Sequence, residues 1–397
     1  MINFDEAYKN VLQHSLDLDV ETVELLRSIG RVLAEDILAD RDFPPFDRAT
    51  KDGIAINYAA IARGVTGFGI EAVVSAGMPQ QKLNDINNCM EIMTGAVVPE
   101  NADTVIMYEH LEIKNGVATL RKEVIKGQDI HRKGSDVISG TVLLDKNLRI
   151  GAAEIGVLAA VGKSAVIVKK LPKVCVISTG NELVEVAETP LPHQIRKSNT
   201  ISLFAALQKQ HIEAEPVHLQ DDKESIRTAL THILKTYDVV LLSGGVSKGK
   251  FDFIPEVMGS LKVKKVFHRV AQRPGKPFWF GVQEAQKTVV FSFPGNPVST
   301  FANYHIYFLP WLRKTFGLAH IEKQVLLQEG IEVKPPLTRF IQVKMENIKG
   351  VLWATKVREN GSGDLTSLAH SDGFICLRPR ETAYKKGESV AFISTKS

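Results

Sequence analysis

The fold class follows from four short apolar runs in one part of the sequence: Val174-Cys175-Val176-Ile177, Ala214 to Leu219, Asp238-Val239-Val240-Leu241-Leu242 and Thr288-Val289-Val290-Phe291. Amphipathic stretches that begin after Asn199 and after Asp222 separate the first three runs. This alternation of strand and helix patterns is typical of a parallel, doubly wound sheet. We therefore predict a central α/β domain.

Helical patterns lie on both sides of a β-rich region in the first part of the chain. Asn3 and Glu6 have the spacing of a capping box, and an apolar pattern from Val23 to Ile37 also has helical spacing. A third helical stretch ends before Pro172. Because the first and third stretches flank one insertion, we expect them to rejoin as one discontinuous domain.

The whole chain is expected to fold into four domains. These are a helical linking domain (1–40 and 140–172), a small β-rich domain (41–139), the α/β domain (173–322) and a C-terminal β-domain that resembles a barrel (323–397). Short alternating runs predict the strands of the second domain, and turn signals such as Lys349-Gly350 predict those of the last.

The composition excludes several classes of function. Of 397 residues 49 are basic and 45 acidic, so the net charge of +4 lacks the excess that is typical of nucleic-acid-binding proteins. Cys89, Cys175 and Cys376 form no CxxC pair, which argues against a disulfide framework and a structural zinc site. Asp5 and Glu6 stand where a signal peptide has basic residues, and no run of about 18 apolar residues follows. We expect a cytoplasmic protein that binds neither nucleic acid nor a membrane.

Polar and glycine-rich loops follow the predicted strands, where an open parallel sheet binds its ligands. The loops are Thr179-Gly180-Asn181-Glu182, Gln220-Asp221-Asp222, Ser243 to Asp252, and Phe293-Pro294-Gly295-Asn296-Pro297. Glycines let backbone N–H groups approach an anion, and carboxylates suit a hard cation such as Mg²⁺. Asp221 or Asp222 is also well placed to cap the next helix. These residues predict a magnesium-assisted enzyme or binding protein for a phosphate-bearing or oxyanionic ligand.

Two further patterns concern anions. Gly244 to Lys250 matches the GxxxxGK of a phosphate-binding P-loop, but Phe251 follows where a P-loop has Ser or Thr, which argues against a nucleoside-triphosphate hydrolase. The segment Arg273-Pro274-Gly275-Lys276-Pro277 places two cations beside a glycine between prolines. A rigid cationic loop of this kind suits an oxyanion.

Five motifs occur along the chain in a fixed order. They are Pro44-Pro45-Phe46-Asp47 with Asp52-Gly53, Met93-Thr94-Gly95-Ala96 with Pro99 and Ala102-Asp103, Ser243-Gly244-Gly245-Val246-Ser247, Pro274-Gly275-Lys276-Pro277, and Pro294-Gly295-Asn296-Pro297-Val298-Ser299. In this order they resemble the molybdopterin molybdenumtransferases, the family of bacterial MoeA and the animal gephyrin E-domain. The resemblance covers essentially the whole chain.

The resemblance implies an elongated homodimer of four-domain chains whose α/β domain has the molybdopterin-binding fold. It implies Mg²⁺-dependent hydrolysis of adenylylated molybdopterin, with transfer of molybdate to the dithiolene and release of AMP. A molybdopterin adenylyltransferase is the implied upstream partner. Glu182, Asp221 or Asp222, and Asp252 would hold the Mg²⁺.

Further roles follow from the same resemblance. Substrate binding is implied for Gly244, Gly245, Ser247 and Asn296, a molybdate pocket for Arg273, Lys276, Pro277, Ser299, Arg339 and Ser367, and catalysis for Asp52, Thr94, Asp136, Glu182, Asp252 and Lys276. For Asp52, Thr94 and Asp136 the alternative is a role in turns and caps that hold a tight loop.

Four positions depart from the family pattern. Lys51 stands in place of the usual Met, His131 in place of Arg, Asn181 in place of Asp, and Lys250 in place of an acidic or polar residue. Asn181 and Lys250 both reduce the negative charge near the expected metal, which weakens Mg²⁺ binding. A second hypothesis therefore stays open: a catalytically weakened paralogue that binds molybdopterin or serves as a scaffold.

Overall fold

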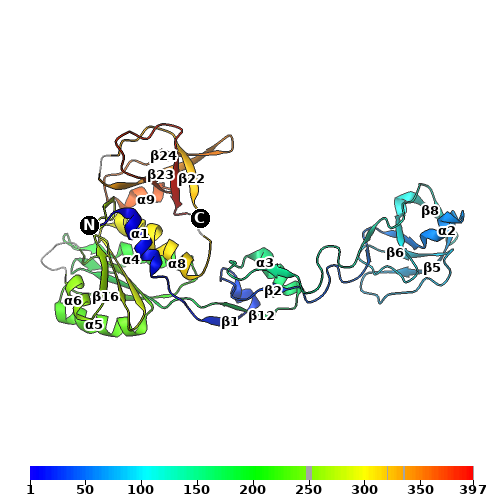
Figure 1. Ribbon diagram of the computed structural model, residues 1–397, viewed down its shortest axis with the longest axis horizontal. Coiled ribbons are helices and arrows are strands. Elements are labelled where there is room, and N and C mark those ends of the chain that lie inside the picture. Colours follow the sequence, from blue (N-terminus) through cyan, green and yellow to red (C-terminus); the bar gives the residue numbers. More distant parts are fainter. Residues whose placement is uncertain (247–252, 320, 334–335, 397) are drawn as a thin grey trace.

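The computed structural model describes residues 1–246, 253–319, 321–333 and 336–396. Figure 1 shows an elongated chain, with an α/β body (residues 173–319) and a C-terminal barrel (323–396) at one end. A distal β-domain (41–139) lies at the other end, and a narrow linking region (14–40 and 140–172) joins the two. Both termini lie at the end that holds the α/β body. We propose these parts as the domains of the chain.

A six-stranded sheet forms the centre of the α/β body. Its order is β16 (Ala214–Leu219), β13 (Val174–Thr179), β17 (Val239–Ser243), β21 (Thr288–Phe293), β20 (Trp279–Gln283) and β18 (Lys264–His268). The first four strands are parallel and coincide with the four apolar runs, so that prediction is confirmed. The sheet is mixed at one edge, because β20 runs antiparallel to both β21 and β18.

Helices cover both faces of this sheet. One face carries α4 (Ser198–Gln208), α7 (Pro297–Asn303), the π-helix η3 (Tyr304–Phe308) and α8 (Leu309–Thr315), and the other carries α5 (Lys223–Thr236) and α6 (Ile254–Ser260). Successive strand residues alternate between the two cores: Val174 and Val176 pack with Leu203 of α4, whereas Cys175 and Ile177 pack against α5. The body is therefore doubly wound, and its central strands are buried on both sides.

Helix α1 (Phe4–Gln13) packs on the α/β body and not in the linking region, where we expected it. Its predicted cap is confirmed, since Asn3 Oδ1 accepts a hydrogen bond from Glu6 N at 2.8 Å. Its apolar stripe, which includes Phe4 and Val11, is buried in the same core as the strands of the body. The expected location was wrong because an amphipathic pattern shows that a helix buries one face, and not which surface covers that face.

The apolar pattern from Val23 to Ile37 is not helical, which corrects our expectation. It forms β1 (Val20–Glu24), the 3-10 helix η1 (Leu25–Ser28) and β2 (Ile37–Leu38). These strands pair with β12 (Ala165–Lys169) and β11 (Val142–Leu144), beside helix α3 (Ala152–Ala160). Gly30 interrupts the segment with a φ of 77°. A short pattern with mixed spacing fits either a strand or a helix, and here pairing with a distant segment favoured the strand.

The distal β-domain has its own six-stranded sheet, which supports the β-rich domain that the sequence indicated. The strand order is β7 (Thr104–Met107), β4 (Gly53–Ile56), β6 (Cys89–Ile92), β5 (Gly67–Val74), β9 (Val117–Leu120) and β8 (Leu111–Lys114). Four short elements complete it: β3 (Arg48–Ala49), α2 (Tyr58–Ala62), η2 (Tyr108–His110) and β10 (Ile130–His131). Ala55 of β4 faces one small core, and Ile54 and Ile56 face another.

The C-terminal strands close into a barrel, as the sequence predicted. They are β22 (Lys323–Leu327), β23 (Thr338–Ile348), β24 (Val351–Lys356), β25 (Gly373–Leu377) and β26 (Ser389–Ser394), with helix α9 (Leu365–His370) beside them. Each of these strands pairs with two others, and β23 closes the ring through β24 and β25. The short strand β19 (Gln272–Arg273) of the α/β body pairs with β23 and so ties the body to the barrel.

Candidate active site

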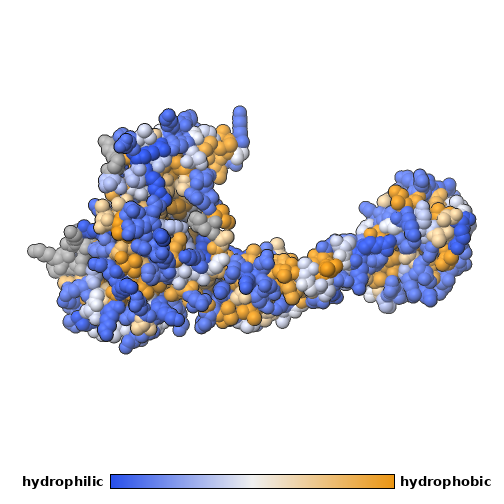
Figure 2. Space-filling view, viewed as in Figure 1, coloured by the Kyte–Doolittle hydropathy of each residue, from blue (hydrophilic) through white to orange (hydrophobic). Residues whose placement is uncertain are grey.

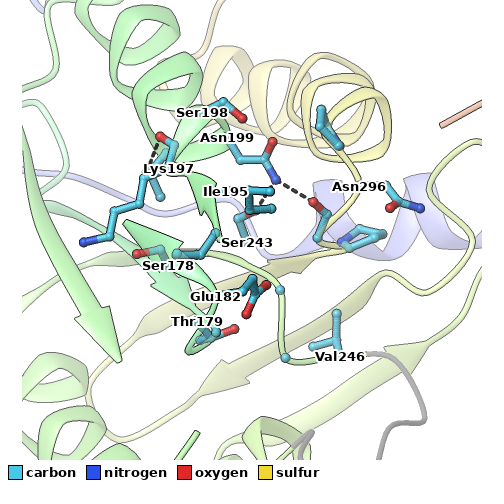
Figure 3. Close-up of a pocket in the computed structure, with 18 of the residues that line it drawn as sticks. Ser178, Thr179, Glu182, Ile195, Lys197, Ser198, Asn199, Ser243, Val246 and Asn296 are labelled. Carbon is cyan, nitrogen blue, oxygen red and sulfur yellow. Dashed lines mark hydrogen bonds between the residues drawn. The ribbon is translucent and has the colours of Figure 1, made fainter. Parts of the chain in front are cut away.

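A cavity of about 380 Å³ lies at the carboxyl ends of β13, β17 and β21. Its walls come from the loops that follow these strands, including Glu182, Gly244 and Asn296, and from the first residues of α4 (Figure 3). Parallel strands bring their following loops to one edge of the sheet, which is why residues far apart in sequence meet here.

Two carboxylates of the expected metal set, those of Glu182 and Asp221, line this cavity. Asp222 has another role: its carboxylate caps α5 by accepting a hydrogen bond from Ser225 N at 2.8 Å. The Ser225 hydrogen bonds hold the pKa of Asp222 below its usual value. Asp252 lies outside the described residues, and the described part of the chain holds no cluster of three His, Cys, Asp or Glu.

The departure at Asn181 has a structural role. Its side-chain Oδ1 accepts a hydrogen bond from Asp221 N at 3.2 Å, so the loop after β13 is joined to the loop after β16. This contact needs an acceptor oxygen and no negative charge. The change from Asp to Asn therefore retains a link between the loops that carry Glu182 and Asp221.

The glycine loop after β17 comes close to the end of β13. Gly244 has a φ of 102°, and a Cβ atom there would lie 2.7 Å from Thr179 Oγ1. Gly245 also has a positive φ, of 71°. Glycine meets both conditions without strain. Gly244 N donates to Phe293 O at 3.1 Å, and the backbone of both glycines lines the cavity, where a ligand can approach it closely. Ser247 and Lys250 of the same loop lie outside the described residues.

Asn199, near the start of α4, connects three walls of the cavity and was missed in the sequence. Its Nδ2 donates to Ser243 Oγ at 2.9 Å and to Gly295 O at 2.6 Å (Figure 3). Asn296, on the same wall, donates from Nδ2 to Ser362 Oγ of the barrel side at 3.0 Å. The signal that could have identified Asn199 is a polar residue at the amino end of a helix beside the carboxyl ends of the parallel strands.

Positive charge borders the cavity beside β16. Lys197 lines the cavity, its side chain is only 12% exposed, and it forms an ion pair with Glu185. This contact holds the pKa of Glu185 below its usual value. His218 is bound to Ser178 at 2.9 Å, and burial, with a smaller effect of Lys197, lowers its pKa. The histidine is therefore neutral at pH 7 and adds no charge to this edge.

The cationic loop from Arg273 to Pro277 meets the barrel. Pro277 lines the cavity, and Arg273 is the register partner of Arg339 on β23. Burial and, next in size, the charge of Arg273 lower the pKa of Arg339, and its Nε has no hydrogen-bond partner among the described residues. Lys276 is exposed on the same loop. The structure thus concentrates positive charge where the body and the barrel meet.

Two hydroxyls assigned to the molybdate pocket are buried. Ser299 lies in α7, and Ser367 lies in α9 beside the barrel. Ser367 Oγ donates to Asp364 O at 2.7 Å and accepts from Gln342 Nε2 at 2.8 Å. A direct bond from this hydroxyl to an oxyanion requires its contact with Asp364 O to break, so the role of Ser367 stays a prediction.

The remaining expected residues lie in the distal β-domain. Asp52 accepts hydrogen bonds from Thr94 N at 2.6 Å and from Thr94 Oγ1 at 2.8 Å, which hold its pKa below the usual value. His131 lies between Arg48 and Asp136, at 3.2 Å and 2.8 Å respectively. The linking region separates these residues from the cavity of the same chain (Figure 1), so one chain does not bring them together.

Comparisons with known proteins agree with this layout. The MoeA N-terminal region (domain I and II) matches residues 2–162, a probable molybdopterin binding domain matches 175–314, and the MoeA C-terminal region (domain IV) matches 324–395. A molybdopterin molybdenumtransferase of Synechocystis is 37% identical over 396 residues, which cover 99% of each chain. The chain belongs to the molybdopterin molybdenumtransferase family. The resemblance seen in the five motifs is thereby confirmed.

Other members of the molybdopterin molybdenumtransferase family are also similar to this chain over its full length. The relative from Staphylococcus epidermidis is 32% identical and covers 100% of this chain and 96% of its own. Two crystal structures titled as molybdopterin biosynthesis MoeA proteins of Pyrococcus horikoshii superpose with TM-scores of 0.85 and 0.83 at 30% and 29% identity, over 100% of both chains. None of the described helices has the length and apolar character needed to span a bilayer.

Proposed function

We propose that this protein inserts molybdenum during molybdenum cofactor biosynthesis. Adenylylated molybdopterin is hydrolysed, molybdate is transferred to the dithiolene, and AMP is released. The observation that carries this proposal is the shared wall at Pro277, where the cavity with its glycine loop adjoins the cationic loop beside Arg339. A phosphate-bearing pterin and a tetrahedral dianion are thus bound side by side.

The donor set of the cavity fits Mg²⁺. Protein sites for this ion use one or two carboxylates together with substrate phosphates and water. Glu182 and Asp221 supply two such carboxylates in one cavity, and Asp252 is proposed as a third. When bound, Mg²⁺ supplies charge neutralisation on the phosphates during anhydride cleavage. Glu182 and Asp221 would hold the ion at the wall of the cavity that the glycine loop also lines.

The chain's own groups have separate tasks in this proposal. The glycine loop at Gly244 and Gly245 lets the phosphates approach its backbone closely, while Asn199 and Asn296 keep the surrounding loops in place. Arg273 and Lys276 bind molybdate, together with Arg339 of the barrel. Guanidinium and ammonium donors match the oxygens of a dianion, and their positive charges hold it next to the dithiolene.

We also propose a homodimer, which would bring Asp52, Thr94 and Asp136 of one protomer to the cavity of its partner. Exposed apolar side chains on the linking region support this proposal, and Figure 2 shows apolar patches along that region. They include Leu26, 77% exposed, and Ile138 at its junction with the distal β-domain, 65% exposed. Exposed apolar patches of this kind are typical of protein interfaces.

The setting of the reaction is proposed on the same basis. Adenylylated molybdopterin has to be made before it can be hydrolysed, so we propose a molybdopterin adenylyltransferase as the upstream partner and the cytoplasm as the location. Molybdate and tungstate share shape and charge, and the cationic loop offers nothing that separates them.

The function is tested by AMP release from adenylylated molybdopterin with Mg²⁺, in the presence and absence of molybdate. We expect release that depends on both Mg²⁺ and molybdate, and that Lys276→Ala abolishes. Binding of the pterin substrate without AMP release would instead support a scaffold paralogue. ATP hydrolysis is measured in the same samples, since only a nucleoside-triphosphate hydrolase, and neither the insertase nor the scaffold paralogue, should turn over ATP.

A further inference from the structure

A buried polar network lies beneath the cationic loop, and no sequence motif marked it. Gln272 Nε2 donates hydrogen bonds to Pro274 O and to Asn303 Oδ1, both at 2.9 Å. Asn303 Nδ2 donates to Gly275 O at 3.3 Å, and Tyr307 Oη donates to Gln272 Oε1. The side chains of Gln272, Asn303 and Tyr307 have no exposed surface. Helix α7 and the π-helix η3 are thus joined to the backbone of the loop.

The direction of each hydrogen bond in this network is determined. Backbone carbonyls only accept, so the amide nitrogens of Gln272 and Asn303 must face Pro274 O and Gly275 O. Burial raises the pKa of Tyr307 well above its usual value, so the phenol keeps its proton and donates. Every polar atom of the Gln272 side chain therefore has a partner. Fully satisfied buried networks hold one conformation.

The loop lies directly on the network because Gly275 allows it. This residue has a φ of 86°, and a Cβ atom there would lie 2.3 Å from Asn303 Oδ1. Asn303 can therefore reach the loop backbone only because position 275 carries no side chain. The hydrogen bonds therefore fix the carbonyl groups of Pro274 and Gly275, while the side chains of Arg273 and Lys276 stay exposed.

Repulsion between two arginines explains why a fixed loop backbone matters for anion binding. Arg273 and Arg339 are register partners on adjacent strands, so two like charges are held close together. Mutual repulsion favours conformations in which Arg273 turns away from Arg339. A backbone that is held rigidly limits this movement and keeps the cations converging on one place before an anion arrives. Preorganisation of this kind raises affinity because less freedom is lost on binding.

We propose that Tyr307, Gln272 and Asn303 are positioning residues that preorganise Arg273 and Lys276 for the oxyanion substrate. The proposal rests on the proposed function of the cationic loop and adds the structural element that shapes it. The three residues touch no substrate. They act on molybdate affinity through the backbone of the loop, and have no effect on the cavity that binds the adenylylated pterin.

The test compares Tyr307→Phe with Tyr304→Phe in the full-length chain. Both tyrosines lie in η3 and are buried, but the hydroxyl of Tyr304 has no partner among the described residues. Loss of one hydrogen bond predicts that Tyr307→Phe raises the KM for molybdate about threefold to tenfold. The KM for adenylylated molybdopterin stays at the wild-type value, and Tyr304→Phe leaves both constants unchanged.

A second measurement reports on the loop without any turnover. Amide hydrogen exchange of residues 270–278 should be faster in Tyr307→Phe than in wild type, and unchanged in Tyr304→Phe. If Tyr307→Phe does not fold, Asn303→Ser, which removes the bond to Gly275 O, takes its place in both measurements. Faster exchange together with a raised KM for molybdate supports the proposal.

Two results overturn it. One is a variant that loses stability while the KM for molybdate and the exchange of the loop stay unchanged, since the network would then be purely structural. The other is an equal rise in the KM of both substrates, since the effect would not be confined to the oxyanion.

If wild type itself releases no AMP in response to molybdate, the proposed function fails. Direct titration of wild type and Tyr307→Phe with molybdate then decides the inference: equal affinities, or no binding, overturn it.

Discussion

Asp221 and Asp222 are neighbours in the sequence, yet the fold gives them different surroundings. Asp221 lines the cavity, whereas Asp222 accepts the hydrogen bond of Ser225 N at the start of α5. A parallel strand followed by a helix makes one acidic residue face the end of the sheet and the next face the helix terminus. A shift of one residue along the chain therefore separates a carboxylate that lines the cavity from one that caps a helix.

At this scale we predict opposite effects for two alanine variants. Asp221→Ala should raise the Mg²⁺ concentration needed for half-maximal AMP release by tenfold or more, because a charged ligand is worth about 1.4 kcal/mol or more. Its melting temperature should stay near that of wild type. Asp222→Ala should lower the melting temperature, through loss of the cap, and keep the Mg²⁺ dependence. Titrating Mg²⁺ and recording thermal melts for both variants checks this, and exchanged behaviour would assign the ligand to Asp222.

The sequence motifs identified some residues of the site and missed others. The motifs pointed to Glu182, Gly244 and Asn296, which all line the cavity. The motifs did not include Gln272 or Asn303. A buried amide belongs to no recognisable sequence pattern, because its role depends on hydrogen bonds to residues far along the chain.

At the scale of elements, the π-helix η3 places a histidine in the core. His305 is 7% exposed and its Nδ1 bonds Phe301 O at 2.9 Å. Burial lowers the pKa of His305 to about 4, against 6.5 for the free side chain. Below pH 6.5 the unfolded chain binds a proton that the folded chain does not. The free energy of unfolding therefore falls as the pH drops from 6.5 towards 4.

We predict that this histidine costs the α/β body about 2 kcal/mol of stability when the pH falls from 7 to 5. His305→Phe, which keeps an aromatic ring and removes the titrating group, should lose less stability over the same range. Denaturant unfolding at pH 7 and pH 5 measures the difference by tryptophan fluorescence, since Trp279 and Trp311 are buried in this body. An identical acid-induced loss in wild type and His305→Phe would show that other groups cause it.

Elements differed in how well local pattern predicted them. The strands β13, β17 and β21 were predicted because burial on both faces requires continuous apolar runs. The segment from Val23 to Ile37 was mistaken for a helix because its strands pair with residues more than a hundred positions away. Stabilisation by pairing with a distant segment cannot be recognised in the local sequence pattern.

At the scale of the whole molecule, the distal β-domain is too far from the cavity to serve it within one chain (Figure 1). If a homodimer brings the two together, Asp52→Ala and Glu182→Ala should complement each other. Each variant alone is inactive, but a mixed dimer contains one site with both residues intact. Mixing equal amounts after dissociation and reassociation should restore about a quarter of wild-type activity.

The control is a mixture of Glu182→Ala with Asp221→Ala, which alter the same cavity and should restore far less. AMP release by the mixtures, with light scattering to establish the mass of the assembly, checks this prediction. A monomeric mass, or no recovery in the Asp52 and Glu182 mixture, would contradict the proposed arrangement between protomers.

The sequence by itself determined the doubly wound sheet, a C-terminal β-domain that resembles a barrel, and the loops that line the cavity. Apolar periodicity, turn residues and glycine motifs are local, and each acts over a few residues. Only the tertiary structure decided that α1 packs on the α/β body, that Asp222 is a cap, and that Gln272, Asn303 and Tyr307 support the cationic loop. Those outcomes depend on which distant surfaces meet, because burial and hydrogen-bond satisfaction are properties of the assembled core.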